Sequence, residues 1–381
     1  MEEDLNLTNC SCQFVSEVEL WVSFILREVS IPLVGSVGVV GNLAAIIVLI
    51  HPDMKSTFHQ SLVTLAVFEI LFLILQICSN GAHLKSELYL VLFPYFLYPL
   101  KSILISCESY LLVSIALERL IAVARPLWYR TARLRLSSWY HALVFILPTL
   151  VISVSINIPK FFELKLASFK VTDINNITRE SKGCLLTSFR LDPDYSEYYI
   201  LTRLLGTSVL PILFLLLINT SIYLSLQRQR PTNTTKINNN NNNIYIGNGN
   251  EKIRINSMLS EEQITENRRC LSHSARTLSA IVIMYVTCNI PRLALDLTEY
   301  RYGAAQLLQS YSECGCINII WLDLFLKLNS FLRTISSSVN FIIYWSVGKQ
   351  FKSTVSGMLT KTLTKIRCRL CFSTTNTHLD V

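Results

Sequence analysis

Seven long apolar runs dominate this chain of 381 residues and restrict the folds open to it. Each run has the roughly 20 residues that a helix needs to cross the hydrocarbon core of a bilayer. Charged residues make up only 16% of the chain, whereas soluble domains carry about 25%. The sequence therefore predicts an all-α membrane protein, a bundle of seven transmembrane helices. The runs cover approximately residues 29–50, 60–80, 91–123, 139–158, 200–226, 275–297 and 319–345.

Charge between the runs predicts how the chain is oriented. The loop 124–138 carries four arginines and no acid, and the tail 346–381 holds six lysines and arginines against Asp380. Positive loops stay in the cytoplasm. The acidic residues 1–28 are predicted to be an extracellular tail, with the protein in the plasma membrane. The net charge of +8 follows the membrane surface, so a nucleic-acid partner is not expected.

The predicted segments follow from this topology. Residues 29–345 form the bundle, and the third intracellular loop, 227–272, is expected to be disordered because its asparagine-rich sequence cannot bury a core. Apolar residues recur on one helical face after residue 346, which predicts a short amphipathic eighth helix on the lipid surface, followed by a cytoplasmic tail. Three sequons fall outside the membrane and are expected to be glycosylated: Asn6, Asn9 and Asn176.

The third run carries three charged residues, Lys101, Glu108 and Arg119. At about 100° per residue these three side chains share one stripe of the helix. A charge that faces lipid costs several kcal/mol, so the stripe is predicted to face protein or water. The third helix is therefore expected inside the bundle.

Five ordered motifs resemble those of rhodopsin-like (class A) G-protein-coupled receptors over nearly the whole chain. Three depart from the usual pattern: Glu69 replaces Asp, Leu120 replaces Tyr in the Glu-Arg-Tyr triplet, and Phe341 replaces Pro in the Asn-Pro-x-x-Tyr motif. The motifs are Gly41-Asn42, Leu65-Ala66-Val67-Phe68-Glu69, Glu118-Arg119-Leu120, Pro211 with Pro291, and Asn340-Phe341-Ile342-Ile343-Tyr344.

A further stretch narrows the resemblance. Residues 157–163, Asn-Ile-Pro-Lys-Phe-Phe-Glu, are similar to a stretch that follows the fourth span of invertebrate FMRFamide-type neuropeptide receptors. The resemblance implies an extracellular peptide ligand and a heterotrimeric G protein as partners. It also implies that Glu118, Arg119, Asn340 and Tyr344 carry activation and G-protein coupling. For Tyr344, an aromatic anchor at the membrane interface is the plainer alternative.

The family's acid at the Glu69 position binds sodium together with neighbouring polar groups. In this chain Glu108 stands near the expected position of a hydroxyl, and the candidate ligands are Glu69, Glu108, Asn42, Ser336 and Asn340. Two acids so close would share either a metal ion or a proton. The alternative is that Glu108 is a protonated core residue. No other cofactor is implied.

Charged residues near the outer ends of the spans are the candidates for binding the ligand. Lys101 occupies the position at which amine receptors carry Asp, which argues against a cationic amine. The other candidates are Arg203 and three residues on one face of the sixth span, Arg292, Asp296 and Glu299. A pocket of mixed charge suits a peptide that contains Arg. Salt bridges among these residues without ligand contact are the alternative.

The disulfide pairing stays open. The family's usual bridge joins the third span to the second outer loop, but its third-span cysteine would fall near Pro94, where there is none. The cysteines available on the outer side are Cys10, Cys12, Cys78, Cys184, Cys314 and Cys316. Cys184 therefore needs a different partner.

The sequence does not predict an enzyme. It contains no HExxH, P-loop, G-x-S-x-G or GxGxxG motif. A transporter is the second class of hypothesis, but the two halves show no internal repeat. The expected function is that of a receptor for an amidated neuropeptide, with a receptor for a non-peptide ligand, or one without a ligand, as the alternative.

Overall fold

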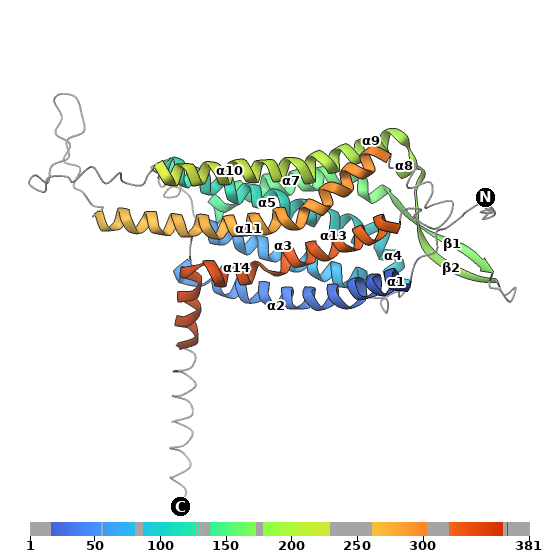
Figure 1. Cartoon of the computed structure of the whole chain (residues 1–381), viewed down its shortest axis with the longest axis horizontal. Coiled ribbons are helices and arrows are strands. Elements are labelled where there is room, and N and C mark those ends of the chain that lie inside the picture. Colours follow the sequence, from blue (N-terminus) through green and yellow to red (C-terminus); the bar gives the residue numbers. More distant parts are fainter. Residues whose placement is uncertain are drawn as a thin grey trace, which may run out of the picture.

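A computed structural model describes residues 17–54, 56–80, 87–126, 128–129, 131, 138–172, 178–228, 261–302, 320–360 and 364. Long helices run side by side along one axis (Figure 1), which confirms the predicted helical bundle. The main helices are α2 (Ile31–Leu49), α3 (Thr57–Asn80), α5 (Tyr98–Ala124), α7 (Ser138–Asn157), α10 (Leu210–Arg228), α11 (Glu261–Tyr302) and α13 (Ile320–Ser338), which α14 (Asn340–Val347) continues.

Shorter elements extend these helices at one end of the bundle (Figure 1). They are α1 (Glu17–Phe24) with η1 (Ile25–Ser30), α4 (Glu87–Leu92) with η4 (Phe93–Leu97), and α9 (Pro193–Leu201) with η6 (Thr202–Val209). The remaining short helices are η2 (Pro52–Met54), η5 (Ile158–Phe162) and α8 (Ser188–Leu191).

Six helices in the described ranges are long and apolar enough to cross a membrane. The seventh, α13, carries Asp323, Lys327 and Arg333 within 19 residues, so it is more polar than a helix that faces lipid on all sides. Its charges fit a position inside a bundle, because a charged side chain is excluded from lipid.

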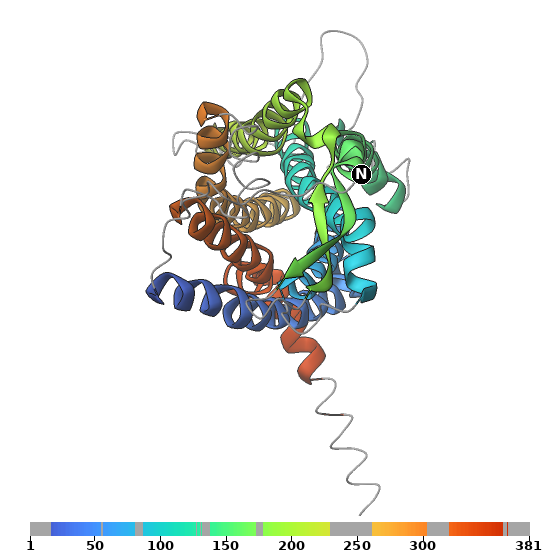
Figure 2. The same ribbon diagram turned by 90° about the vertical axis from the view of Figure 1, so that its right-hand side faces the viewer.

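A two-stranded hairpin covers part of one end of the bundle. Strands β1 (Leu164–Thr172) and β2 (Thr178–Leu186) pair antiparallel, with Leu164 opposite Leu186 and Thr172 opposite Thr178. Figure 2 looks onto this end and shows the hairpin lying across the mouth of a ring of helices. We call this end of the bundle the hairpin end.

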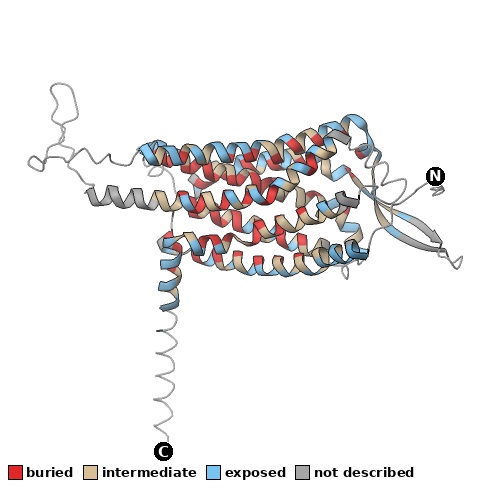
Figure 3. Ribbon diagram, viewed as in Figure 1, coloured by how far each residue is buried: buried red, intermediate tan, exposed pale blue. Residues whose placement is uncertain are grey.

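Burial is arranged as expected for a protein in lipid. Buried residues face the interior of the bundle, whereas exposed residues line its outer faces (Figure 3). On α2, for example, Ala45 is fully buried, but Val37, Val40 and Ile47 expose 64%, 67% and 62% of their surface. Apolar side chains this exposed along a whole face indicate contact with hydrocarbon.

Two helices begin earlier than the sequence predicts. Helix begins at Glu17, so the second half of the expected tail 1–28 is helical. Likewise α11 begins at Glu261, inside the expected loop 227–272, because Glu, Gln and Arg favour helix when no packing decides. Residues 229–260 of that loop lie outside the described part, as do Asn6, Asn9 and Asn176.

Residues 349–360 are also helical and run across the axis of the bundle (Figure 1). Phe351 and Thr354 are buried, and Val355 and Met358 pack against the core. The alternation agrees with an amphipathic helix. That it lies on the lipid surface stays a prediction.

Four cysteines of the described residues are free thiols: Cys78, Cys107, Cys184 and Cys288. Cys184 lies on β2, and its Sγ is 4.0 Å from the carbonyl oxygen of Leu90. A bridge between Cys78 and Cys184 is thus absent. Cys10, Cys12, Cys314 and Cys316 lie outside the described residues, so the pairing of Cys184 stays open.

A close approach of α2 and α13 depends on Gly38. A Cβ atom there would lie 2.6 Å from the Cβ of Ser338 and 2.8 Å from Cδ1 of Leu73. We expect Gly38→Ala to destabilise the protein by about 1–3 kcal/mol, the usual cost of overpacking. Thermal unfolding of purified protein measures this. Gly357→Ala is the control, because nothing lies within 4 Å of its added Cβ; equal melting temperatures in both variants would contradict the packing.

Candidate functional site

Glu118 and Arg119 lie near the end of α5, at the end of the bundle opposite the hairpin. Nη2 of Arg119 is 3.0 Å from Oε1 of Glu118, and the two residues expose 6% and 0% of their surface. A buried ion pair is weak evidence of stability. Its chemistry nevertheless suits a two-state element, because a change in the surroundings can separate two such charges.

Two further residues hold this pair, and the sequence did not reveal either. Tyr129 donates a hydrogen bond of 2.6 Å from its hydroxyl to Oε1 of Glu118. The guanidinium of Arg119 lies over the ring of Phe58, 4.3 Å from its centroid. Burial, reinforced by the negative charge of Glu118, raises the pKa of Tyr129 to about 12. Tyr129 therefore stays protonated, and remains a donor, throughout the physiological pH range.

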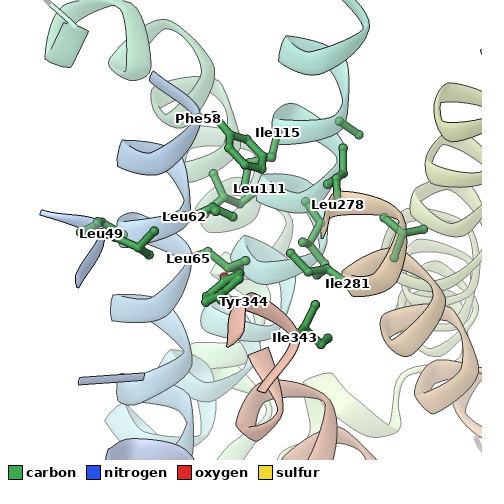
Figure 4. Close-up of a cluster of buried hydrophobic side chains, with 14 of the residues drawn as sticks. Leu49, Phe58, Leu62, Leu65, Leu111, Ile115, Leu278, Ile281, Ile343 and Tyr344 are labelled. Atoms are coloured by element: carbon green, nitrogen blue, oxygen red, sulfur yellow. The ribbon is translucent and has the colours of Figure 1, made fainter. Parts of the chain in front are cut away.

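Tyr344 lies inside the bundle, with 2% of its surface exposed. Figure 4 shows its ring beside Leu65 in a cluster that also contains Leu111, Ile281 and Ile343. Its hydroxyl is buried without a hydrogen-bond partner among the described residues. This placement contradicts the alternative of an interfacial aromatic anchor, because such an anchor sits in the headgroup region.

The candidate sodium ligands lie in the middle of the bundle. Asn340 donates a short hydrogen bond to Oε1 of Glu69, and Nδ2 of Asn42 donates to the carbonyl oxygen of Ser337 at 2.8 Å. The hydroxyl of Ser337 is 3.5 Å from Oε1 of Glu108. Ser336 is buried, but Ser337, one residue away, makes the contacts to the neighbouring helices.

We call Asn42, Glu69, Glu108, Asn340 and the Ser336–Ser337 pair the polar centre. Three of its oxygens are buried with no hydrogen-bond partner in the part of the chain that the structure describes. They are Oδ1 of Asn42, Oε2 of Glu69 and Oε2 of Glu108. Unmatched buried oxygens of this kind suit a hard cation or an added proton. No group of three or more His, Cys, Asp or Glu that could bind a metal occurs in the described ranges. The donors would thus be two carboxylates with amide and hydroxyl oxygens.

Four of the five predicted ligand-side residues come together at the hairpin end. Nε of Arg203 is 2.8 Å and Nε of Arg292 is 3.1 Å from Oδ1 of Asp296. Arg203 also pairs with Glu299. Ser208 donates to Oδ2 of Asp296 at 2.6 Å. We call Arg203, Arg292, Asp296 and Glu299 the charged cluster. Asp296 is fully buried and is its centre.

Lys101 lies outside the charged cluster. Its ammonium donates to the hydroxyl of Ser79 at 3.3 Å, on the α3 side of α5. It is close enough to Arg333 on α13 for the two positive charges to repel. Arg333 itself was not predicted. It is 8% exposed and donates from Nη2 to Oδ1 of Asn289 on α11 at 2.6 Å.

The stretch 157–163 holds several helices together at the hairpin end. Asn157 donates to the hydroxyl of Ser106 on α5 at 2.8 Å. Glu163, 1% exposed, accepts hydrogen bonds from Tyr98 at 2.5 Å and Tyr195 at 2.6 Å. Lys160 is 3.2 Å from the same carboxylate. These contacts join α5, α7 and α9, so the motif supports the mouth of the bundle.

The geometry described above is a membrane bundle with a buried ion pair at one end, a polar centre and a charged cluster at the other. The seven-transmembrane receptor (rhodopsin family) pattern matches residues 41–344. The chain belongs to the rhodopsin family of seven-transmembrane receptors. This match confirms the seven-helix fold expected from the apolar runs. The family is a receptor class and not a class of enzymes.

Three relatives narrow the comparison. The receptor is 24% identical over 350 residues to the FMRFamide receptor of Drosophila melanogaster, which covers 88% of the chain and 53% of that protein. It is 21% identical over 363 residues to the probable G-protein coupled receptor frpr-1 of Caenorhabditis elegans, covering 90% and 81%. It is 22% identical over 335 residues to the FMRFamide peptide receptor frpr-18 of that worm, covering 84% and 66%. The chain spans about half the length of the fly receptor.

These relatives confirm the predicted similarity to FMRFamide-type receptors and support a neuropeptide receptor.

Proposed function

We propose that the receptor binds an amidated neuropeptide of the FMRFamide type outside the cell and activates a heterotrimeric G protein inside it. The observation that carries this proposal is that the two ends of the bundle hold different charged sites. A charged cluster around Asp296 lies at the hairpin end, and the Glu118–Arg119 pair lies at the opposite end. A ligand that prefers one arrangement of the helices shifts the population at both ends.

The charged cluster suits a peptide with an Arg side chain. The name of the fly relative contains the peptide Phe-Met-Arg-Phe-amide. The Arg is the one charged side chain of that peptide. Asp296 and Glu299 are each paired with an arginine of the receptor. An Arg of the peptide would compete for these carboxylates, so that binding rearranges contacts between η6 and α11.

At the cytoplasmic end, the structure suits a closed state. Arg119 is held by Glu118 and Phe58, and an outward movement of α11 would expose it to a G protein. Tyr344 would then leave its apolar cluster, and Asn340 would shift its contact with Glu69. We assign Glu118, Arg119, Asn340 and Tyr344 to this switch, with the N-terminus outside and the chain in the plasma membrane.

Tyr129→Phe is expected to raise basal G-protein activity about tenfold. A hydrogen bond to a charged group is worth about 1.5–3 kcal/mol, and the phenylalanine keeps the ring while removing the donor to Glu118. G-protein activation without peptide measures the change. Tyr140→Phe is the control, because Tyr140 is exposed on α7. Unchanged basal activity at equal surface expression would show that Tyr129 does not hold the closed state.

The polar centre is proposed to bind sodium, with Glu69, Glu108, Asn42, Asn340 and the Ser336–Ser337 hydroxyls as the candidate donors. The three unmatched oxygens support this assignment. A sodium ion there would neutralise one of two buried acids and so favour the closed arrangement.

Sodium is expected to raise the melting temperature of the purified receptor, because a ligand that binds only the folded state stabilises it. Replacing choline chloride with sodium chloride at constant ionic strength should give a rise that Glu108→Gln removes. Stabilisation by acidification, without a response to sodium, would indicate a shared proton instead.

The function is tested by calcium release in cells that express the full chain with a promiscuous G protein, against a library of amidated peptides. Cells without the receptor are the control. Potent activation by Arg-containing amidated peptides supports the proposal. High activity with no peptide and no response to any of them would favour a ligand-independent receptor.

A further inference from the structure

Two buried polar side chains on α13 are not accounted for by the sites described above. Asn329 and Arg333 expose 7% and 8% of their surface. They are four residues apart, so their side chains lie one above the other on the same face of the helix. Nη1 of Arg333 and Oδ1 of Asn329 are both buried with no hydrogen-bond partner among the described residues.

This pair offers one donor and one acceptor. Buried polar groups in proteins are nearly always hydrogen-bonded, and an unmatched one costs free energy. Arg333 is already fixed through its other nitrogen, because Nη2 donates to Oδ1 of Asn289 at 2.6 Å. Nη1 of Arg333 and Oδ1 of Asn329 are therefore two unmatched polar atoms one helical turn apart on α13.

We infer that Arg333 and Asn329 bind the C-terminal carboxamide of the peptide, an assignment that rests on the proposed function. A primary amide has a carbonyl oxygen that accepts and an NH₂ group that donates. The carbonyl oxygen accepts from Nη1 of Arg333, and the NH₂ group donates to Oδ1 of Asn329. An ester or a carboxylate lacks that N–H.

The positive charges at and near Arg333 also favour binding of the amide's carbonyl oxygen. Lys101 and Arg333 are close enough to repel, and Glu108 is the acid that attracts Arg333. Lys101 and Arg333 together make a local positive field that attracts a carbonyl or carboxylate oxygen. Because this field would also attract a free acid, the acceptor of Asn329 is the atom that sets the preference for an amide.

The distance from the Asn329–Arg333 pair to the charged cluster suits the length of a short peptide. Asn289, the partner of Arg333, lies seven residues before Asp296 on α11, a distance of about 10 Å along the helix. An extended peptide advances about 3.5 Å per residue. A peptide with Arg next to its amidated residue spans this distance when the Arg side chain reaches outward to Asp296 and its amide points inward to Arg333.

The test compares three forms of Phe-Met-Arg-Phe on the receptor expressed as the full chain of 381 residues: the amide, the methyl ester and the free acid. The ester keeps the carbonyl and lacks both N–H donors. Calcium release, normalised to surface expression, gives the potency of each. On the wild type the amide is expected to exceed the ester by at least tenfold. In Asn329→Leu this ratio should fall to within threefold of unity, whereas Arg333→Met should weaken amide and ester alike by tenfold or more.

The matched control is Ser330→Ala. Ser330 is on the same turn but accepts a hydrogen bond from Gln76 on α3, so its loss should leave the amide-to-ester ratio at the wild-type value. Asn329→Asp keeps the acceptor and serves if Asn329→Leu does not reach the surface. It should retain the preference for the amide over the ester and discriminate against the free acid at least threefold more strongly than the wild type.

The outcomes separate the two proposals. A wild type that responds to the amide, with the same amide-to-ester ratio in Asn329→Leu, overturns the carboxamide site alone. An amide-to-acid ratio in Asn329→Asp below that of the wild type does the same. A wild type that is silent to every amidated peptide overturns the proposed function, and the carboxamide site with it.

Discussion

Arg119→Ala is expected to abolish G-protein activation while the receptor still reaches the surface and binds its peptide. The guanidinium of Arg119 is 3.0 Å from Glu118 and over the ring of Phe58, and in the open state it is the donor proposed to meet the G protein. Alanine has no donor to offer there. The peptide contacts proposed at the hairpin end are on other helices, so they should remain.

The loss is expected to be nearly complete, at least a hundredfold in maximal response. Removing Arg119 also leaves Glu118 as a buried acid with Tyr129 as its one partner among the described residues, and breaking a buried pair destabilises a protein by about 3–5 kcal/mol. Surface expression must therefore be measured with the signal. The double variant Glu118→Gln with Arg119→Ala removes the unpaired charge, and it should restore expression without restoring signalling.

The measurement is G-protein activation in membranes together with binding of a labelled peptide. Arg125→Ala is the matched control, because Arg125 is an exposed arginine just beyond α5, and it should keep at least half of the response. Wild-type signalling by Arg119→Ala at equal surface density would remove Arg119 from the coupling machinery.

Patterns in the sequence predicted those features that depend only on residues close together along the chain. The apolar runs gave the helices because the need to satisfy backbone groups in lipid leaves little alternative. Glu118 and Arg119 are adjacent in sequence, so their contact requires only that α5 be buried on that side. The i, i+4 spacing of Arg292 and Asp296 likewise placed them together.

Contacts between helices could not be predicted in this way. The bond of Tyr129 to Glu118 depends on how the chain turns after α5, and that of Arg333 to Asn289 joins two helices. Ser337 contacts Glu108 across 229 residues of sequence. Ser336 was the candidate from the sequence; since one residue turns a helix by about 100°, an error of a single position selects a different face.

The stretch 157–163 shows a different limit. Its similarity to a receptor subfamily pointed to the ligand class, but the sequence did not say what its residues do. In the structure Glu163 is the shared acceptor of Tyr98, Tyr195 and Lys160. Such a role depends on side chains from α5 and α9, which a local pattern does not contain.

Asp296→Ala and Arg292→Ala are each expected to weaken peptide potency by more than tenfold, with the larger loss for Asp296→Ala, because Asp296 is the proposed partner of the peptide's Arg and Arg292 positions its carboxylate. Asp296 is fully buried and its carboxylate lies within 3.1 Å of Nε of both Arg203 and Arg292. Without it, two cations share Glu299, and the site repels the Arg of a peptide that it would otherwise attract. Thr298→Val is the control and should keep wild-type potency, because Thr298 is a partly buried residue of the same helix whose hydroxyl donates to the carbonyl oxygen of Ala294 in that helix.

A ligand exchange separates direct contact from general damage. Citrulline has nearly the shape of arginine but no charge, so a peptide carrying it should lose at least tenfold on the wild type. On Asp296→Asn, which keeps the volume of the side chain, the two peptides should be nearly equal, since the interaction that distinguishes them is gone. Normal potency in both Asp296→Ala and Arg292→Ala would mean that the cluster only holds η6 to α11. The peptide's charge would then have to be recognised elsewhere, because a salt bridge that the ligand never breaks carries no information about the ligand.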